Sequence, residues 1–415
     1  MRWRGFVAVM VVGLVSGAAS PRAVGDDSAD PWASRRVLNV AHAGGDLEAP
    51  HSTLFAMKTA VRAGTDVLEM DVRLSADGAL VVHHDETLDR TTNATGVVRD
   101  RTVAELQSLD NAYWFVPNCW SCHDRPEAEY AYRGIRTGAR PAPMGFTSDD
   151  FTIPTLEQVA AAFPSRLLDV EIKDGVDGIA AAEALAAFIA DHGPADRYLV
   201  ASFDDDILAH FKSLAPHVAT SPGLNETIEW FATREAMPHH EVLQVPPVFS
   251  GIEVVTQQFV DDAHADGLAV WVWFNGTDDD APDEWNRLVD LGVDALLTGK
   301  PKAAQALLVE RGVAFRAAPD LVAGFAPPGR LHVTYRCPVV HVDRCRSLLV
   351  VVTKRADGTV WFDVRLVGAR RGAERELELR GFTGRRRSVE TVVVAFPIND
   401  DTALAAVRAM PPSPT

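Results

Sequence analysis

The pattern of apolar and polar positions over residues 37–312 alternates between short strand-like runs and helix-length segments. The strand-like runs are Val37–His42, Val67–Asp71, Leu167–Lys173, Tyr198–Ser202, His217–Thr220, Glu241–Val245, Leu268–Phe274 and Ala295–Thr298. The segments with helical periodicity are Ser52–Ala63, Thr155–Phe163, Ile179–Asp191, Asp204–Leu214, Asn225–Glu235, Thr256–Ala265, Pro282–Leu291 and Lys302–Arg311. Eight strands alternating with eight helices are typical of a closed parallel sheet surrounded by helices, so the pattern predicts an α/β fold, a (β/α)8 TIM-type barrel.

One segment departs from this alternation. Ser75–Gly78 separates the second strand from the apolar run Ala79–His83, and its Asp-Gly pair is a signal for a tight hairpin. A hairpin joins antiparallel strands, whereas neighbouring barrel strands are parallel. We therefore expect a return strand above the barrel, followed by a long insertion over about residues 79–150. Long loops at this end of a barrel commonly cover the active site.

The pattern changes again after the barrel. Residues 313–329 include the run Phe325–Gly329, rich in proline and glycine, and are predicted to be a linker. Residues 330–415 are expected to form a small β-rich extension. The strands expected there are Leu331–Tyr335, Ser347–Thr353, Val360–Val367, Glu374–Leu379 and Val389–Phe396.

Carboxylates recur on one face of two barrel strands. In the run from Val67 to Arg73, Glu69 and Asp71 alternate with apolar residues, so both lie on the same face of the strand. Glu171 repeats this placement on the third strand. Like charges inside a barrel need a cation between them, and oxygen ligands suit Mg²⁺ or Ca²⁺. The sequence therefore predicts a divalent cation bound by Glu69, Asp71 and Glu171; the alternative is that these side chains face solvent.

Two histidines and a lysine end the same strands. His42 follows the first strand, His84 ends the return strand and Lys173 ends the third strand. Active sites of such barrels lie at the carboxyl ends of the strands, so we expect these side chains to surround the carboxylates. An imidazole has an ordinary pKa near 6.5 and suits proton transfer near neutral pH.

The order and spacing of these motifs resemble the glycerophosphodiester phosphodiesterase family. The segments that carry the resemblance are Ala41–Thr53, Leu68–Val72, Asp77–Asp85, Leu88–Thr92, Val170–Lys173, Ser202–Phe203, Val270–Trp273 and Gly292–Thr298. The resemblance implies a metal-dependent enzyme that hydrolyses glycerophosphodiesters to glycerol 3-phosphate and an alcohol. It also assigns roles by motif: metal ligands Glu69, Asp71 and Glu171; acid–base residues His42 and His84; and substrate-binding residues Lys173 and Trp273.

Three positions depart from the family's pattern. Ala43 replaces the arginine that follows the first histidine, His51–Ser52 replaces a Glu-Asn pair, and Gly299 stands where the family often has aspartate. Loss of the guanidinium removes a bidentate partner for phosphate. We expect His51 to contribute to substrate binding in its place, or Arg133 or Arg136 of the insertion to reach the pocket.

Two other functions are compatible with the sequence. The first is a phospholipase D-like enzyme acting on lysophospholipids or sphingolipids, with an acyl chain held by aromatic residues of the insertion. These aromatic residues are Tyr113, Trp114, Phe115 and Trp120. The second is a barrel that binds a metal or a phosphate ligand without turnover.

The first residues have the pattern of a signal peptide over residues 1–23, with Arg2 and Arg4 before the short apolar run from Phe6 to Val15. The sequence therefore predicts a secreted protein, extracellular or periplasmic, with no transmembrane span. In an oxidising compartment two local disulfides are expected, Cys119–Cys122 and Cys337–Cys345. A zinc site including Cys119, Cys122 and His123 is the alternative for the first pair.

Charge is distributed unevenly along the chain. The net charge of −17 argues against nucleic-acid binding through a basic surface. Residues 330–415 nevertheless contain 15 basic and 9 acidic side chains, a net charge of +6, which leaves −23 for the first 329 residues. This basic region, including Arg385–Arg387, is predicted to be solvated or to contact anionic lipid or another anionic envelope surface.

Overall fold

The computed structural model describes residue 32, residues 37–314 apart from 165 and 238, and most of the strands between 320 and 409. The chain divides into two compact units, one formed by Asp30–Phe315 and the other containing Arg316–Thr415. The signal peptide predicted over residues 1–23 lies outside the described residues. Among the described helices, none is both long enough and apolar enough to cross a membrane.

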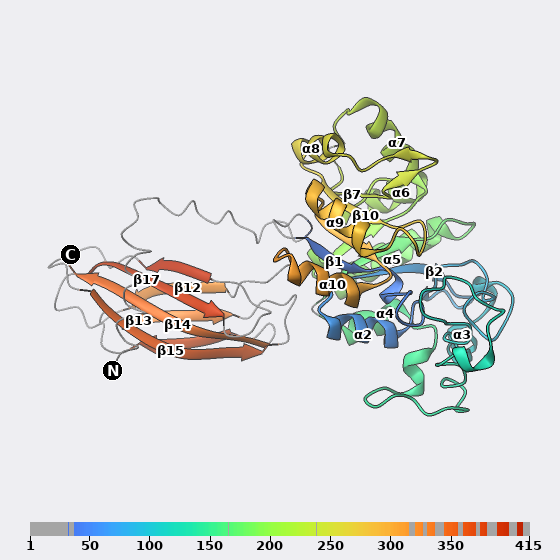
Figure 1. The fold of residues 1–415 in the computed structure, drawn as a ribbon, viewed down its shortest axis with the longest axis horizontal. Coiled ribbons are helices and arrows are strands. Elements are labelled where there is room, and N and C mark those ends of the chain that lie inside the picture. The colour runs from blue at the N-terminus through green and yellow to red at the C-terminus, as the bar shows by residue number, and fades with distance from the viewer. Residues whose placement is uncertain are drawn as a thin grey trace. The chain divides into compact units, whose positions relative to one another are not determined.

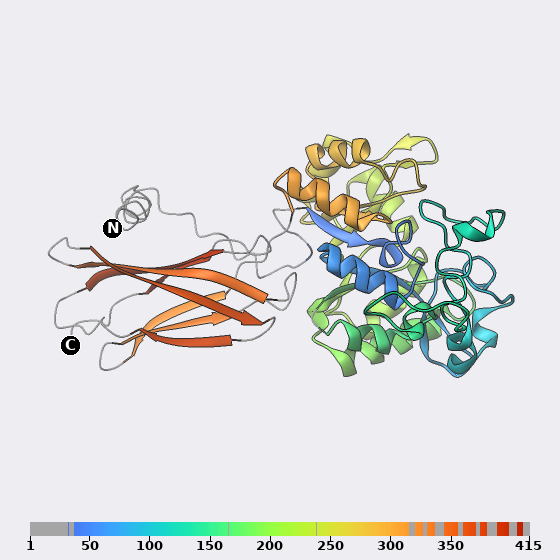
Figure 2. The same cartoon turned by 60° about the horizontal axis from the view of Figure 1, so that its bottom comes forward.

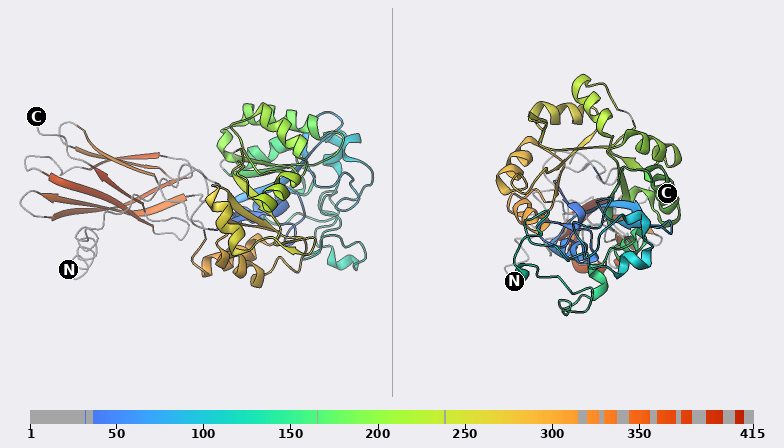
Figure 3. Two further views of the ribbon diagram at one scale, coloured as in Figure 1. Left: turned by 90° about the horizontal axis from the view of Figure 1, so that it is seen from above. Right: turned by 90° about the vertical axis from the view of Figure 1, so that its right-hand side faces the viewer.

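The first unit is built on a parallel sheet that curves into a nearly closed barrel. Within residues 37–314, its parallel strands are β1 (Leu38–Ala41), β2 (Val67–Leu74), β4 (Leu167–Ile172), β5 (Tyr198–Ala201), β6 (Ala219–Thr220), β7 (Val242–Val245), β10 (Ala269–Trp273) and β11 (Ala295–Thr298). Their order is β6-β5-β4-β2-β1-β11-β10-β7. The end strands β6 and β7 approach each other through Glu241, whose backbone nitrogen donates to the Thr220 oxygen over 3.1 Å. The predicted barrel is confirmed, and Figure 3 shows its strands inside a ring of helices.

Helices follow the strands and cover the outside of the sheet (Figure 1). They are α2 (Leu54–Ala63), α4 (Leu156–Ala162), α5 (Gly178–His192), α6 (Asp205–Leu214), α7 (Leu224–Thr233), α8 (Gln257–Ala265), α9 (Pro282–Leu291) and α10 (Pro301–Glu310). The predicted segment Ser52–Ala63 starts two residues before α2, which begins at Leu54. Thr53 is the N-cap, because its hydroxyl accepts a hydrogen bond of 3.1 Å from the Ala56 amide.

The alternation on β2 has a packing explanation. Leu68, Met70 and Val72 belong to an apolar cluster shared with the helices outside the sheet, and all three are fully buried. The side chains between them therefore point toward the inside of the barrel. Burial of the apolar face stabilises the strand and directs Glu69 and Asp71 into the barrel.

The insertion after β2 begins with the predicted return strand. β3 (Leu80–Val82) pairs antiparallel with β2, with Val72 opposite Val82. The segment that follows includes α3 (Val103–Ser108) and gathers on one side of the barrel, where it is coloured cyan to teal in Figure 2. It carries an apolar cluster of its own, formed by Val81, Leu88, Val98, Leu106 and Ile153. This cluster holds a long loop in a defined conformation.

The second unit consists of antiparallel sheets in its described part. Its strands are β12 (Asp320–Ala326), β13 (Arg330–Arg336), β14 (Arg344–Arg355), β15 (Val360–Arg370), β16 (Glu374–Leu379), β17 (Ser388–Pro397) and β18 (Ala405–Ala409). The sheet orders are β12-β13-β16 and β15-β14-β17-β18. A buried hydrogen bond of 2.9 Å joins the Tyr335 and Ser347 hydroxyls.

The predicted linker contains a strand. β12 lies inside the stretch 313–329 that the sequence analysis assigns to a linker, and it pairs with β13 along its full length. The pairing of β12 with β13 places this part of the predicted linker inside the second unit. Cys337 and the basic segment Arg385–Arg387 lie outside the described residues.

A short hairpin follows β7 on the barrel. It pairs β8 (Val248–Phe249) with β9 (Ile252–Glu253) in antiparallel register. Its turn places Ser250 and Gly251 at φ angles of 50° and 81°, in the left-handed region. Glycine is suited to the second position, because a side chain there would be strained.

Candidate active site

Three carboxylates converge inside the barrel at the carboxyl ends of β2 and β4. Glu69, Asp71 and Glu171 each place an oxygen within 4.8 Å of the others. Asp71 lies opposite Glu171 in the parallel pairing of β2 with β4. Sequence alternation and strand register together therefore bring the three predicted ligands to one point.

The electrostatics of the cluster fit a cation. Burial, followed by the charge of Asp71, raises the pKa of Glu69 well above its ordinary value. Burial likewise raises the pKa of Glu171. The Asp71 Oδ2 atom is buried and has no hydrogen-bond partner among the described protein atoms. A divalent ion would remove all three penalties, since hard cations take carboxylate oxygens as ligands.

Lys173 supplies the positive charge that the protein itself places in this cluster. Its Nζ atom lies 2.7 Å from a Glu171 oxygen and 3.5 Å from an Asp71 oxygen. Burial opposes the charged form of Lys173, but Asp71 and Glu171 raise its pKa above the ordinary value. The lysine is therefore an ammonium ion beside the carboxylates, positioned to meet an anionic group.

His42 is held by a carboxylate that the sequence analysis did not single out. The Asp46 carboxylate lies 3.2 Å from His42 Nδ1, four residues away along the chain. Burial disfavours protonation of His42, yet Asp46, and then Glu69, raise its pKa to about 10. Asp46 therefore orients the imidazole and leaves its other nitrogen directed away from the carboxylate partner.

The Asp46 side chain occupies space that is open because Gly299 has no side chain. A Cβ atom at position 299 would collide with the Asp46 carboxylate and with the Leu47 side chain. The backbone nitrogen of Gly299 instead donates to Asp280 over 2.9 Å, and burial raises the pKa of Asp280 to about 6. The glycine that departs from the family pattern is thus part of the packing that places Asp46 beside His42.

His84 has a parallel arrangement. Its Nδ1 atom lies 2.6 Å from Asp85, and the Asp85 carboxylate also pairs with Arg90, whose Nε atom is 2.5 Å away. Burial alone would raise the pKa of Asp85, but hydrogen bonds from His84 and Arg90 hold that pKa well below its usual range. Arg73 fixes the backbone, since its Nε donates to the His84 oxygen over 2.9 Å. His42 and His84 are therefore each oriented by an adjacent carboxylate.

His51 lies behind this pair rather than in the open cavity. Its Nε2 atom is 3.5 Å from Arg90 and its Nδ1 atom is 2.7 Å from the Ser52 hydroxyl. A guanidinium only donates, so His51 Nε2 accepts and Nδ1 donates to Ser52. Burial, and then the charge of Arg90, lowers the pKa of His51 well below its ordinary value. His51 is neutral here, so it does not replace the missing arginine as a cation; Arg90 carries the nearby positive charge.

Trp120 covers the histidines from the insertion. Its ring centre lies 6.1 Å from that of His42, 5.2 Å from His51 and 5.5 Å from His84. The Arg90 guanidinium stacks on the same ring at 4.0 Å. A disulfide between Cys119 and Cys122, with Cα atoms 6.1 Å apart, brackets Trp120.

The other insertion residues proposed for the pocket lie elsewhere. Arg133 is held by Glu127 and stacks on aromatic rings, including those of Tyr113 and Trp114. Arg136 pairs with Asp149 over 2.6 Å. These contacts stabilise the insertion itself and give neither arginine a place in the lining of the cavity.

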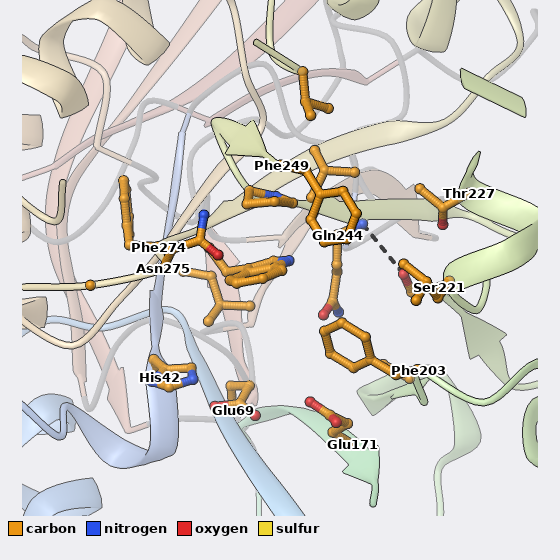
Figure 4. A pocket seen from close by; sticks show the side chains of 18 of the residues that line it. His42, Glu69, Glu171, Phe203, Ser221, Thr227, Gln244, Phe249, Phe274 and Asn275 are labelled. Carbon is orange, nitrogen blue, oxygen red and sulfur yellow. Dashed lines mark hydrogen bonds between the residues drawn. The ribbon is translucent and has the colours of Figure 1, made fainter. Parts of the chain in front are cut away.

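The cluster opens into a cavity of about 630 Å³. His42, Glu69, His84, Glu171, Lys173 and Trp273 all line it. Figure 4 shows His42, Glu69 and Glu171 on one side, with Phe203 beside Glu171, and Phe249 and Phe274 across from them. The structure therefore brings all the residues assigned to metal binding and proton transfer to one site, together with the predicted Lys173 and Trp273. Asp71 belongs to the carboxylate cluster but is not among the lining residues, and neither are His51, Arg133 and Arg136.

Known proteins are similar to this chain in sequence over the barrel. The glycerophosphoryl diester phosphodiesterase family matches residues 42–303. A glycerophosphodiester phosphodiesterase from Caldanaerobacter subterraneus subsp. tengcongensis is 29% identical over 276 residues, covering 64% of this chain and 96% of that protein. One from Bacillus altitudinis is 29% identical over 272 residues, covering 64% of this chain and 95% of its own length.

Solved structures agree on the fold. The glycerophosphoryl diester phosphodiesterase domain of an uncharacterized Mycobacterium tuberculosis protein aligns with a TM-score of 0.52 at 22% identity, covering 65% of this chain and 98% of that domain. A glycerophosphoryl diester phosphodiesterase from Parabacteroides distasonis aligns with a TM-score of 0.50 at 19% identity, covering 68% and 90% of the two chains. Because the family match spans most of the barrel, this chain belongs to the glycerophosphoryl diester phosphodiesterase family and is a phosphoric diester hydrolase.

Proposed function

We propose that the protein is an exported, divalent-metal-dependent enzyme that hydrolyses glycerophosphodiesters to glycerol 3-phosphate and an alcohol. One observation carries the proposal. Three buried carboxylates with oxygens within 4.8 Å of one another lie in a cavity that also contains two histidines, each paired with an acidic side chain. The names of the related proteins support the same substrate class.

Glu69, Asp71 and Glu171 would hold the cation, with Mg²⁺ or Ca²⁺ favoured by an all-oxygen set. When bound, such an ion supplies positive charge that polarises a non-bridging phosphate oxygen. Lys173 would add a second positive charge beside the phosphate and help to orient it. The Phe203 and Trp273 rings, with centres 5.9 Å apart, form a wall beside the same position.

Proton transfer falls to His42 and His84. One imidazole accepts the proton of the attacking hydroxyl, which belongs to water or to the glycerol 2-hydroxyl, and the other donates a proton to the departing alkoxide. Asp46 and Asp85 keep the two rings in position. Trp120 limits the access of water to both rings.

Export is supported by the amino-terminal sequence pattern and by the disulfide. Cys119 and Cys122 are joined in a segment that covers the site, and disulfides persist in oxidising compartments. Expression of the full chain in a secreting bacterial host, followed by amino-terminal sequencing of the protein outside the cytoplasm, tests this part. A protein that stays in the cytoplasm with residues 1–23 attached would contradict it.

The activity is tested with purified protein and glycerophosphocholine. We expect release of glycerol 3-phosphate, loss of that release in EDTA, and recovery when Mg²⁺ or Ca²⁺ is restored. Full turnover in EDTA would refute the metal requirement. A protein that binds the metal but never releases product would be a non-catalytic barrel.

A further inference from the structure

One side of the active-site cavity is lined mainly by apolar side chains. We propose that this site accepts phosphodiesters that carry one long hydrocarbon chain, and that the chain lies on this side of the cavity. The inference rests on the proposed phosphodiesterase function. It concerns which members of that substrate class the enzyme prefers.

The polar and apolar residues of the cavity come from different strands. His42, Glu69, Glu171 and Lys173 belong to the segments around β1, β2 and β4. Across the cavity, the segments between β6 and β10 contribute mainly apolar side chains. These are Leu224, Ile228, Phe231, Val245, Phe249, Ile252, Val254 and Phe259. One continuous cavity thus joins a phosphate site to an apolar arm, here defined by these eight residues.

The size of the cavity fits an amphiphile. Its 630 Å³ falls within the range of about 300–1,000 Å³ that accommodates drug-sized ligands. A glycerol group placed against the apolar arm would leave hydroxyls without hydrogen-bond partners, which disfavours binding. A hydrocarbon chain has no such groups, and each buried methylene improves binding by up to about fourfold.

The arm continues to the surface. Ile252 is 57% exposed, Ile228 47% and Phe249 37%, and all three also line the cavity. Phe203, which stacks on Trp273 near the carboxylates, is 45% exposed as well. An apolar rim continuous with an apolar interior gives a chain longer than the cavity somewhere to extend.

The β8–β9 hairpin is fixed in place as one wall of the arm. Asn275 Nδ2 donates to the Val248 oxygen over 2.8 Å, and the Val254 nitrogen donates to Pro247 over 2.9 Å. At the other end, Arg287 pairs with Glu253 at 3.2 Å. The hairpin therefore presents Phe249 and Ile252 to the cavity in a defined position.

The proposal does not change the chemistry. The net reaction adds water across one P–O bond, so the phosphate keeps the water-derived oxygen and the alkoxide leaves as an alcohol. The chain remains on one of the two products. Occupation of the arm affects binding and orientation of the substrate, which act on kcat/KM.

The decisive experiment is a chain-length series. The purified protein is assayed with glycerophosphocholine and with lysophosphatidylcholines of about six to twelve acyl carbons, below their micelle concentrations. We expect kcat/KM to rise about two- to fourfold per added methylene until the arm is filled. Equal or falling kcat/KM along the series, with good turnover of glycerophosphocholine, would overturn the inference and leave the proposed function standing.

Matched variants locate the effect. Ile228→Asn places an amide on the arm, and Val309→Asn makes the comparable change on α10, where Val309 is 46% exposed and outside the cavity lining. Ile228→Asn is expected to reduce the ratio of long-chain to glycerophosphocholine kcat/KM by about tenfold or more, because polar burial opposes the chain. Val309→Asn should leave the ratio unchanged. An unchanged ratio in Ile228→Asn would contradict the placement of the chain.

A binding measurement separates this inference from catalysis. Dodecylphosphocholine, a phosphodiester with one alkyl chain, is titrated below its micelle concentration while bound ligand is measured by calorimetry. Saturable binding that Ile228→Asn weakens, and that a short-chain analogue does not reproduce, supports the arm even in a protein that shows no turnover. Absence of saturable binding to the folded protein refutes it.

Discussion

The two sides of the cavity are built on different physical principles. On the side of β1, β2 and β4, charged and titratable side chains are held close to fixed partners, as in the His42–Asp46 and Lys173–Glu171 pairs. On the side of β6 to β10, the walls are apolar side chains, some of them partly exposed. Charged groups at short range depend steeply on position, whereas apolar burial is non-directional. The first side should therefore be sensitive to single-atom changes, and the second should respond to changes in polarity and area.

The most damaging change is expected at the cation site. Asp71→Asn removes a charged ligand at almost constant shape, and its neighbours Glu69 and Glu171 would no longer hold the metal. Several kcal/mol of transition-state stabilisation are lost, so kcat/KM should fall by about ten-thousandfold. Metal analysis by mass spectrometry should show the ion lost with the activity. The control is Asp290→Asn, at an exposed carboxylate paired with Arg311. If Asp71→Asn protein still bound the metal and remained active, the assignment of Asp71 as a metal ligand would be wrong.

His84 is expected to rank next. His84→Ala removes a proton-transfer group, and kcat should fall by about a hundredfold to a thousandfold. His51→Ala should cost less, because His51 is neutral and lies outside the lining of the cavity. Steady-state kinetics on one glycerophosphodiester compare the two. If His51→Ala proved more damaging, the acid–base assignment would have to be revised to include His51.

Asp46 is expected to have a smaller effect, because it acts by positioning His42. Asp46→Asn weakens a charged hydrogen bond to His42, so we expect a tenfold to hundredfold loss in kcat/KM, or about 1.5–3 kcal/mol. The pKa of His42 in metal-free protein, about 10 with Asp46 present, should fall in the variant. Two-dimensional NMR titration of the His42 imidazole measures this pKa in both proteins. A normal pH titration of His42 in both proteins would mean that Asp46 does not position it.

The smallest effect is expected at the disulfide. Replacing Cys119 and Cys122 with serine opens a very short loop, which in the chain-entropy description costs about 2 kcal/mol of stability in the covering segment. Trp120 should become more mobile, with only a severalfold loss of kcat/KM. Thiol titration of the unreduced wild-type protein should detect no thiol at these two positions. Stoichiometric zinc bound there instead would contradict the disulfide.

Much of the acidic side could be predicted from the sequence because its signals are local. Alternation places Glu69 and Asp71 on one face of β2, and the parallel register with β4 adds Glu171. The hairpin signal at Asp77–Gly78 likewise predicts that β3 returns along β2. These features depend on period and turn chemistry, which a few neighbouring residues determine.

Sequence patterns were less informative where a residue's contacts lie far away in the sequence, or where strand pairing competes with local composition. β12 lies in a stretch rich in small residues and proline, and its pairing with β13 outweighs that composition. Arg90 and Trp120 belong to the insertion, and no periodicity indicates that they converge on His51. Proximity in loops of this kind is a result of packing, not of local propensity.

The sequence by itself determined the alternation of strands and helices, the inward direction of the carboxylates and the residues available for proton transfer. Only the tertiary structure decided that Asp46 rather than a more distant acid orients His42, in space left by Gly299. It also decided that apolar residues of α7, the β8–β9 hairpin and α8 form one arm of the cavity. Local periodicity is set by backbone geometry, but which surfaces meet depends on closing the barrel and burying apolar area across long sequence separations.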